Sequence, residues 1–366
     1  MNAVVTGATG HLGANLVRVL LAQGIPVRVM VRSESNKIGI ERLPVEVVTG
    51  DILQPASLNS VLAGCTHLFH AAAVFDFHPH KRNTILETAV TGTKNILEAA
   101  IKCSTLQRIV YTSSTAAIGY SRNARSPKTE LHWNDDFDSP YVEAKTRAEQ
   151  LVHEMQLATG LPIVTVNPSV LLGYYDYRLT PSTQMVHRFL MQSLPVTIPG
   201  GMSIVDVTDA AVGHFLAAER GIPGERYILT GGNLTIREFY DTTAELTGLS
   251  APSWELGKAT GSLAVKAMEA YAKLRRKAPQ LTLKRFRSLY QRYGFYDAAK
   301  AKSELGFQPT AVRNAIARSI AWLLLANSIP IERVKKMSLQ EEVMRYLPNE
   351  WEPGKVFQLQ SFQGHQ

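Results

Sequence analysis

Short runs of β-branched and other apolar residues alternate with longer stretches in which apolar residues recur at helical spacing through the first half of the chain. The short runs predict strands, and the longer stretches predict the helices that connect them. The predicted strands are residues 3–5, 27–31, 45–48, 67–70, 108–111 and 163–166, and the predicted helices are 12–22, 58–63, 84–103 and 141–159. This alternation is typical of an α/β fold with a doubly wound parallel sheet.

The rhythm breaks after Pro168. Strand-like runs return at 203–207 and 227–229 around a helical stretch at 209–220, and Thr235 with Glu238 predicts a capped helix over 235–247. Residues 255–330 have a mainly helical pattern, and little periodicity follows. We therefore predict a Rossmann-type domain over 1–170 with returning segments at about 200–230, a smaller and mostly helical substrate lobe from 171–199 and 231–335, and a C-terminal tail over 336–366.

Composition places the chain among reduced globular proteins. Apolar residues make up 45% and charged residues 19% of the 366 positions, which argues against disorder. Two cysteines, Cys65 and Cys103, exclude a disulfide framework and a cysteine-based zinc site. No apolar run is long enough to span a bilayer, and no signal-peptide pattern precedes the first strand. We expect a soluble cytoplasmic protein.

Charge is unevenly distributed. The chain carries a net charge of +8, and residues 251–366 hold all of the excess. Residues 273–292 contain eight Lys and Arg and no acid. A solvated surface and an amphipathic helix resting on anionic lipid are two interpretations of this segment. The preferred hypothesis is that it receives an anionic group on the substrate, such as coenzyme A or the phosphopantetheine of a carrier protein.

A glycine-rich loop, TGATGHLG, joins the first predicted strand to the first helix. Glycines here permit a tight turn, close approach of a pyrophosphate and close helix–sheet packing, and the helix N-terminus attracts the anion. The spacing is GxxGxxG, which is a strong signal only because it lies at the first strand–helix junction. The predicted cofactor-binding residues of this loop are Gly7, Thr9, Gly10, His11, Leu12 and Gly13.

The end of the second strand indicates the type of dinucleotide. An acid there would favour NAD, but the chain has Arg32, with Lys37 close behind. A guanidinium binds phosphate through paired hydrogen bonds, so we predict NADP as the cofactor, with a solvated Arg32 as the alternative. Further predicted contacts are Asp51 and Ile52 at the adenine and the small residues Ala71, Ala72 and Ala73 at the sheet edge.

Tyr141 and Lys145 lie four residues apart at the start of a predicted helix and so share one face. An ammonium one turn away favours the phenolate, so we expect Lys145 to lower the pKa of Tyr141. The hydroxyls of residues 112–114 follow the fifth strand, where one can bind a carbonyl oxygen. Tyr and Lys at this spacing also decorate ordinary helix surfaces, but the glycine loop in the correct chain order makes coincidence improbable.

Together these motifs give the chain a family resemblance. TGATGHLG, GDILQPASL, HAAAVF, VTGTKNILEAA, YTSS, YVEAK and NPSVLLG resemble the extended short-chain dehydrogenase/reductases, in particular the epimerase/dehydratase-like and dihydroflavonol-reductase-like branches. The resemblance implies Ser114, Tyr141 and Lys145 as the catalytic set. It further implies contacts of Thr112, Tyr141, Lys145, Pro168 and Val170 with the cofactor.

Departures from the family pattern bear on the substrate. Ala89 replaces a helix Asn, Gly119 replaces a substrate-reading Asn of the dihydroflavonol reductases, and residues 115–117 lack the acidic pair of the sugar-nucleotide dehydratases. Phe75, Thr115, Tyr141 and Tyr174 are the predicted substrate-binding residues, with core packing as the alternative for Tyr174. The histidines at 67, 70, 78 and 80 lack acidic partners at ligand spacing, so we predict no metal.

The predicted function is reduction of a ketone or aldehyde by an NADP(H)-dependent oxidoreductase, with hydride transfer and Tyr141 as general acid. A nucleotide-sugar epimerase that uses the cofactor transiently is the alternative, and a nonenzymatic nucleotide-sensing protein is a third hypothesis. The expected partner is a small carbonyl compound, with no nucleic acid. Helices equivalent to 84–103 and 141–159 often pair across a dimer in the family, which leaves a homodimer open.

Overall fold

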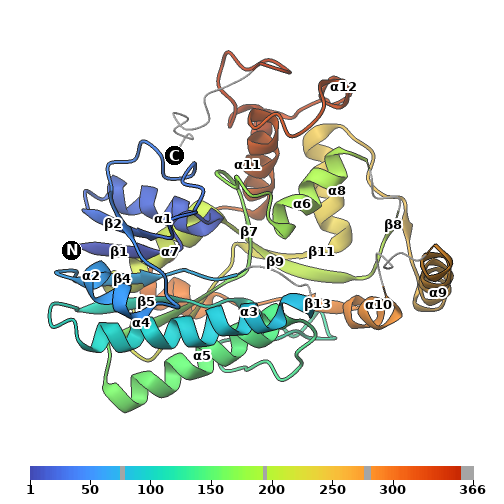
Figure 1. The fold of residues 1–366 in the computed structure, drawn as a ribbon. Coiled ribbons are helices and arrows are strands. Elements are labelled where there is room, and N and C mark those ends of the chain that lie inside the picture. The colour runs from blue at the N-terminus through green and yellow to red at the C-terminus, as the bar shows by residue number, and fades with distance from the viewer. Residues whose placement is uncertain (75–78, 193–195, 276–281, 356–366) are drawn as a thin grey trace.

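In the computed structural model, seven parallel strands form a twisted central sheet (Figure 1). The structure describes residues 1–74, 79–192, 196–275 and 282–355. In spatial order the strands are β3 (Glu46–Thr49), β2 (Val27–Val31), β1 (Ala3–Thr6), β4 (His67–His70), β5 (Arg108–Thr112), β6 (Ile163–Pro168) and β10 (Arg226–Leu229). The order reverses between β1 and β4, where a doubly wound sheet opens a crevice at the carboxyl ends of its strands. The predicted fold class is confirmed.

Helices cover both faces of this sheet because its strands are apolar on both sides. Ala3 of β1 pairs with Val27 of β2 and with His67 of β4, which aligns the three strands at one level. The helices α1 (His11–Ala22) and α7 (Val207–Arg220) pack on the face that includes Val5, whereas α2 (Leu58–Leu62), α4 (Gly92–Ile101) and α5 (Pro140–Thr159) pack on the face that includes Val4. Figure 1 shows these two helical layers on opposite sides of the sheet.

The expected helix over 84–103 is divided into three parts. It begins as α3 (Arg82–Leu86), widens into the π-helical turn η3 (Glu87–Thr91) and continues as α4. Ala89, the departure from the family Asn, lies buried in this turn. Short 3₁₀ turns lie elsewhere at η1 (Pro55–Ser57), η2 (Pro79–Lys81) and η4 (Thr115–Ala117).

A second, smaller sheet forms the base of the other lobe. It contains β7 (Val170–Leu172), β9 (Gly200–Asp206), β11 (Gly232–Thr235) and β13 (Arg292–Gly294). Of the segments between 200 and 230, β10 is a strand of the large sheet and α7 packs on one face of that sheet, whereas β9 belongs to the small sheet. The sequence pattern predicted most of β9 as a strand but not the sheet that it joins, because β7, β11 and β13 have only three or four residues each and pair with β9 over long separations.

Helices α6 (Pro181–Leu190), α8 (Ile236–Thr247) and α11 (Val312–Leu325) pack on the small sheet around the buried Trp322. The predicted capping box is confirmed at the start of α8. The Glu238 amide donates to Thr235 Oγ1 over 3.1 Å, and the Thr235 amide donates to Glu238 Oε2 over 2.8 Å. The π-helical turn η5 (Ala301–Leu305) leads toward α11.

The far end of this lobe carries β8 (Val196–Thr197), β12 (Trp254–Glu255), α9 (Lys258–Leu274) and α10 (Leu283–Leu289), which lie away from the large sheet (Figure 1). None of the helices in the described ranges is both long and apolar enough to cross a membrane.

The segment after residue 335 is packed into the second lobe as far as Leu347. It contains α13 (Glu341–Met344), which follows α12 (Ile331–Val334), and it buries Val343, Tyr346 and Leu347 in the same core as Trp322. Helices of one turn are too short to give a periodic signal, which is why the sequence predicted only an irregular tail.

Candidate active site

The glycine loop turns tightly at the carboxyl end of β1. Gly7 has φ +73°, a left-handed conformation that favours glycine, and the Gly10 amide donates to the Gly7 carbonyl over 3.0 Å. A Cβ on Gly13 would lie 2.2 Å from the Gly7 oxygen, so only glycine permits this approach of helix and loop. Gly10 caps α1 without a side-chain hydrogen bond, which leaves the first amides of the helix available. The loop therefore fits a dinucleotide pyrophosphate.

The residues predicted for the adenosine half line the same edge of the sheet. Arg32 and Lys37 are exposed in the segment after β2. The Leu53 amide donates to Asp51 Oδ1 over 2.9 Å, which orients that carboxylate, while Ile52 is buried. The amides of Ala71 and Ala72 donate to Thr6 and hold the small-residue segment beside Gly7.

The His11 side chain is held by the protein itself, and a contact of this residue with the cofactor stays a prediction. Its buried imidazole donates from Nε2 to the Tyr174 carbonyl over 3.0 Å, and Nδ1 lies 4.0 Å from Asp176 Oδ2. The side chain therefore attaches the loop after β7 to the start of α1.

Arg178 was not found by sequence analysis and lies at the glycine loop. Its Nη2 donates to Thr9 Oγ1 over 3.2 Å, although 169 residues separate the two in the chain. The loop that carries it is fixed, because the Arg178 and Thr180 amides donate to Asp176 and Trp322 Nε1 donates to the Asp176 carbonyl. A guanidinium from the substrate lobe therefore stands beside the predicted pyrophosphate site.

Ser114, Tyr141 and Lys145 meet at the carboxyl ends of β5 and β6. Helix α5 begins at Pro140, the Val142 amide donates to Ser139 Oγ over 3.4 Å, and the helix presents Tyr141 and Lys145 one turn apart. The Tyr141 hydroxyl is hydrogen-bonded to Ser114, and Lys145 Nζ donates to the Thr112 carbonyl over 2.9 Å. The structure thus brings the three predicted catalytic residues together.

Burial controls the protonation of this group. It raises the pKa of Tyr141 to about 12, and the hydrogen bond from Ser114 offsets only part of that rise. Burial therefore outweighs the lowering that was expected from Lys145, and the net shift of the Tyr141 pKa is upward. Burial also lowers the pKa of Lys145 to about 8, with the Glu149 carboxylate acting in the opposite direction. At neutral pH, Tyr141 is a phenol and Lys145 a cation.

Two buried histidines complete the polar surroundings of Lys145. Burial, together with the charge of Lys145, lowers the pKa of His70 to about 3. Burial also lowers the pKa of His214 to about 4, although its hydrogen bond to the Ala210 backbone acts in the opposite direction. His70 bonds to Thr6 Oγ1 over 2.7 Å, and His214 bonds to Thr112 Oγ1 over 3.0 Å. Both rings are therefore neutral structural groups. In the described ranges, no three His, Cys, Asp or Glu side chains are grouped as metal ligands.

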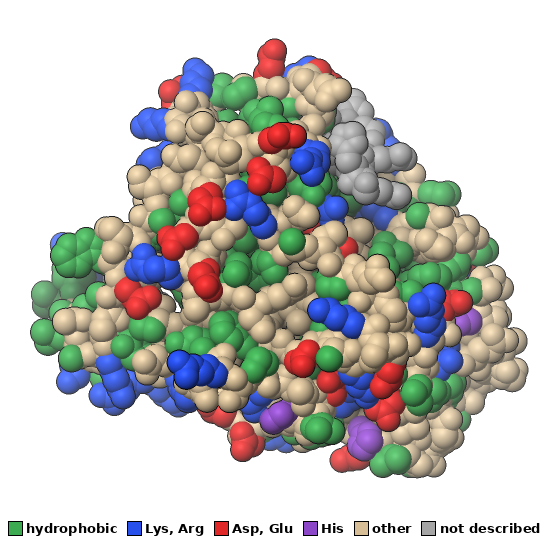
Figure 2. Space-filling model, turned by 180° about the vertical axis from the view of Figure 1, so that it is seen from behind, with side chains coloured by type: hydrophobic (Ala, Val, Ile, Leu, Met, Phe, Trp, Pro, Cys, Tyr) green, Lys and Arg blue, Asp and Glu red, His purple; other side chains and the backbone are tan. Residues whose placement is uncertain are grey.

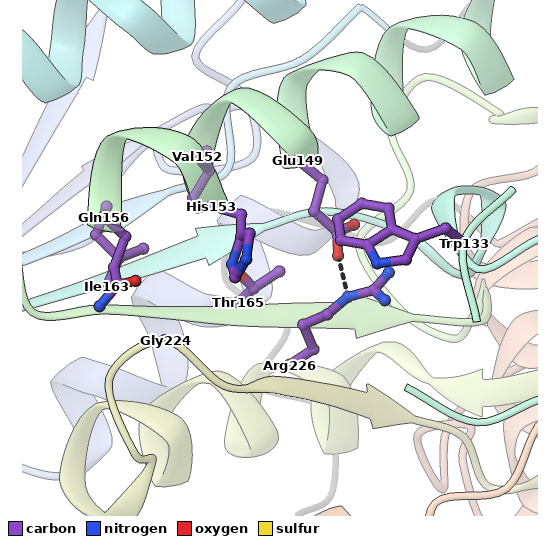
Figure 3. Close-up of a pocket in the computed structure, with 9 residues that line it drawn as sticks. All are labelled: Trp133, Glu149, Val152, His153, Gln156, Ile163, Thr165, Gly224 and Arg226. Carbon is purple, nitrogen blue, oxygen red and sulfur yellow. Dashed lines mark hydrogen bonds and ion pairs between the residues drawn. The ribbon is translucent and has the colours of Figure 1, made fainter. Parts of the chain in front are cut away.

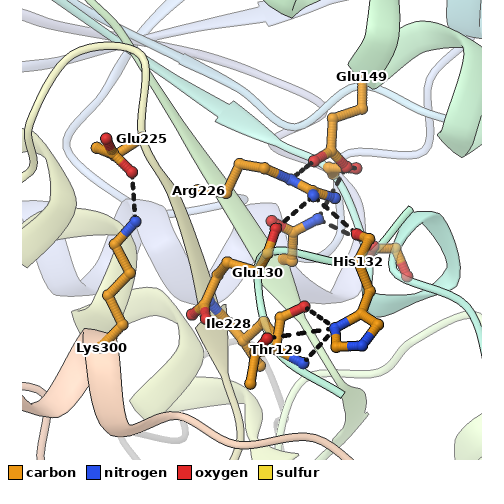
Figure 4. Close-up of polar contacts among 11 residues, drawn as sticks. Thr129, Glu130, His132, Glu149, Glu225, Arg226, Ile228 and Lys300 are labelled. Atoms are coloured by element: carbon orange, nitrogen blue, oxygen red, sulfur yellow. Dashed lines mark hydrogen bonds and ion pairs between the residues drawn. The ribbon is translucent and has the colours of Figure 1, made fainter.

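Glu149, one turn beyond Lys145, is the centre of a buried polar network that sequence analysis missed. Glu149 is 1% exposed. Its carboxylate accepts hydrogen bonds from Ser113 Oγ, from Asn167 Nδ2 over 2.8 Å and from Arg226 Nε over 2.5 Å. Figure 4 shows Arg226 reaching across from β10 to this carboxylate. Asn167 also donates to the Ser114 carbonyl over 3.1 Å, so the network fixes the main chain that carries the catalytic hydroxyl.

The outer part of the network is closed to substrate. Arg226 lies 3.9 Å above the Trp133 ring and donates to the Glu130 and His132 carbonyls over 2.7 and 2.9 Å. Figure 3 shows Trp133, Glu149 and Arg226 at one end of a small cavity with His153 and Gln156 farther along it. The cavity offers about 10 Å³, room for one water molecule. Glu149 therefore lies where it can influence Lys145 and Ser114 but cannot contact the substrate.

The predicted substrate residues fall into three groups. Phe75 lies outside the described residues. Thr115 follows Ser114 in η4, where its carbonyl accepts from Tyr296 Oη over 3.2 Å. Tyr174 is corrected to the core-packing alternative, because it is 3% exposed, donates through Oη to the Tyr346 carbonyl over 2.5 Å and packs edge-on against Trp322.

Two further tyrosines lie near the catalytic residues: Tyr120 acts on the pKa of Tyr141, and Tyr296 donates to the Thr115 carbonyl. Tyr296 Oη donates to the Gly119 carbonyl over 2.9 Å, and the Arg292 guanidinium lies 3.3 Å above the Tyr120 ring. Arg292 is also paired with Asp138, just before the start of α5. A Cβ on Gly119, with φ +91°, would approach Asn134 Oδ1 to 3.1 Å, so this position favours glycine for its own backbone.

Comparison with known proteins agrees with this geometry. The model of the NAD dependent epimerase/dehydratase family matches residues 3–229. A putative dihydroflavonol 4-reductase of Synechocystis is 34% identical over 336 residues, covering 87% of this chain and 93% of that protein. Sterol demethylase protein B of Methylococcus capsulatus is 30% identical over 334 residues, covering 88% of this chain and 98% of that protein.

Two further likenesses extend the comparison. The cinnamoyl-CoA reductase CAD2 of Medicago truncatula is 28% identical over 243 residues, covering 62% of this chain and 74% of that protein. The crystal structure of gox2253 has a TM-score of 0.79 and 32% identity, covering 88% of this chain and 97% of that one. The chain therefore belongs to the NAD dependent epimerase/dehydratase family and is an oxidoreductase of the extended short-chain dehydrogenase/reductase type, as its sequence motifs had indicated.

Proposed function

We propose that this protein is an NADPH-dependent reductase of ketones or aldehydes. The observation that carries the proposal is the meeting of Ser114, Tyr141 and Lys145 at the crevice edge of the large sheet, beside a loop that fits a dinucleotide. The relatives named as reductases support the same reaction class. NADPH, when bound, would supply the hydride that adds to the carbonyl carbon.

The chain's own residues would manage the carbonyl oxygen. Ser114 would donate a hydrogen bond to this oxygen, and Tyr141 would transfer its phenolic proton to it, which yields the alcohol and a tyrosinate. A pKa of Tyr141 raised to about 12 keeps the phenol protonated at neutral pH, which suits an acid. The ammonium of Lys145 would stabilise the tyrosinate until a proton from water restores it.

The preference for NADP is the part of the proposal that depends on Arg32. Arg32→Asp should weaken NADPH binding much more than NADH binding, because it places a carboxylate against the 2′-phosphate. Fluorescence titration with each cofactor measures the two dissociation constants. Lys102→Asp is the matched control, since Lys102 is exposed at the C-terminus of α4, at the opposite edge of the sheet. Equal losses for both cofactors would contradict the role of Arg32.

Arg178 gives a second, separable contribution to cofactor binding. Because it contacts Thr9 in the glycine loop, Arg178→Ala should weaken NADPH and NADH alike, by about tenfold for one lost charge-assisted contact. Isothermal titration calorimetry with both cofactors tests this. A loss confined to NADPH would place Arg178 at the 2′-phosphate, and unchanged affinities would show that it does not hold the pyrophosphate.

For the substrate we propose a largely apolar carbonyl compound. Support comes from the relatives named for a dihydroflavonol and a sterol, and from the tyrosines Tyr120 and Tyr296 near Tyr141 and Thr115. A coenzyme A group on that substrate stays a prediction, supported by the exposed Lys284 and Arg287 of α10 and by the cinnamoyl-CoA reductase relative.

A further inference from the structure

Helix α9 has two apolar faces, and only one of them is covered. Gly261, Val265 and Ala272 are buried along the inner face, where a Cβ on Gly261 would lie 2.3 Å from the Phe286 ring of α10. The helix is therefore closely packed on α10 through that side.

The outer face of α9 exposes large apolar side chains along its length. Leu263 is 71% exposed and Leu274 is 81% exposed, and because the two positions are eleven residues apart, about three helical turns, they lie on one side of the helix. Ala267 and Ala270 lie between them on that side and are exposed, and Tyr271, 59% exposed, borders the stripe. Single exposed leucines are ordinary, but an unbroken stripe of this kind marks an interaction surface.

Cations border this stripe on both sides. Lys266 and Lys273 flank it at one edge, and Arg275, which lies 5.4 Å above the Tyr271 ring, flanks it at the other. Residues 256–296 contain one acid, Glu269, whose Oε1 accepts from the Leu283 amide and so is directed toward α10. Among the residues described at this end of the molecule, the exposed cations are Lys258, Lys266, Lys273, Arg275, Lys284 and Arg287.

The position of α9 leaves the face accessible. Figure 1 shows α9 and α10 at the end of the molecule farthest from β1, and Figure 2 shows hydrophobic side chains beside Lys and Arg side chains at the corresponding left edge. Trp254, in the neighbouring strand β12, is 73% exposed.

The arrangement of charge and apolar surface selects one kind of partner. An amphipathic helix at a membrane interface inserts its apolar stripe and extends flanking Lys and Arg toward anionic headgroups. A second copy of the chain fits poorly, because a two-fold contact through this face would set like charges against each other. We propose that the outer face of α9 docks the protein on the surface of a membrane that contains anionic lipid.

Vesicle flotation tests this proposal without any assay of activity, so its outcome is independent of the proposed reduction. The full-length protein is mixed with vesicles of phosphatidylcholine alone or with phosphatidylglycerol added, at low and high salt. We expect binding to the anionic vesicles that weakens with salt. The double variant Leu263→Asp/Leu274→Asp should bind at least about tenfold less, since it loses two inserted side chains and gains two negative charges.

The control is Leu157→Asp, which changes a leucine that is 69% exposed on α5 and should bind as the unmodified protein does. All replaced leucines are exposed, so the variants should melt at the same temperature as the parent. Absence of binding to anionic vesicles, equal binding to both vesicle types, or full binding by the double variant would overturn the proposal. So would a dimer in sedimentation velocity that this double variant dissociates.

Discussion

Tyr141→Phe should leave the protein folded and able to bind its cofactor but should lower kcat for carbonyl reduction by about 10² to 10⁴-fold. The substitution removes only the phenolic oxygen, and with it the proton that the carbonyl oxygen must gain. The hydrogen bond to Ser114 is lost as well, but Ser114 Oγ still accepts from the Ala116 amide over 3.1 Å, which keeps the turn after β5 in place.

Steady-state kinetics and a cofactor titration on the same preparation make this test specific. The Kd for NADPH should stay within about twofold, because binding free energy depends on contacts that the substitution leaves intact. Tyr240→Phe is a matched control, since Tyr240 is a buried tyrosine that stacks on Phe189 in the second lobe. Near-normal kcat in Tyr141→Phe, or an equal loss in both variants, would rule out Tyr141 as the proton donor.

Glu149→Gln should have the second largest effect, on stability and on the pH profile together. Removing the carboxylate leaves the Arg226 guanidinium without its buried partner, which should reduce the free energy of unfolding by about 3 kcal/mol. Among the described residues, Glu149 is the charged group that acts on the pKa of Lys145, because His70 and His214 are neutral and Tyr141 is a phenol at neutral pH.

The sign of the pH effect follows from the pKa of Lys145. Burial lowers it to about 8 and Glu149 raises it, so the loss of Glu149 should lower it further. The ammonium is needed as the tyrosinate forms, so turnover should fall as the pH rises through the pKa of Lys145. We therefore expect the alkaline limb of kcat to begin near pH 8 in the unmodified protein and at lower pH in Glu149→Gln.

Arg226→Gln separates this electrostatic role from a structural one. It breaks the same ion pair and should cost comparable stability, but it keeps the carboxylate beside Lys145. The alkaline limb of kcat in Arg226→Gln should therefore not move to lower pH. If both variants shift the limb equally, or if neither does, Glu149 does not act on Lys145.

The parts of this protein that local sequence patterns determine could be predicted, and they include much of the candidate site. Gly7 and Gly13 lie where a turn and a close approach exclude any Cβ, and Tyr141 and Lys145 are held together by helix geometry alone. The parallel sheet follows from the alternation of apolar runs and helical stretches, which requires no knowledge of distant contacts.

What the sequence could not predict depends on residues brought together by the whole fold. Arg178 reaches Thr9, and Arg226 reaches Glu149 across 77 residues, with no local pattern that would link either pair. Glu149 itself had a usable signal, since it follows Lys145 by one helical turn. The rise in the pKa of Tyr141 caused by burial was not predicted, because the spacing of two residues gives no measure of burial.

The most direct test of the central claim is isotope transfer from the cofactor. NADPH carrying deuterium at the transferable C4 position is incubated with the protein and a panel of apolar ketones and aldehydes, and the products are analysed by mass spectrometry and NMR. The account predicts consumption of NADPH and one deuterium on the carbinol carbon of the product, with both signals lost in Tyr141→Phe. Inversion of a nucleotide sugar with retained cofactor, and no deuterium in any alcohol, would contradict it.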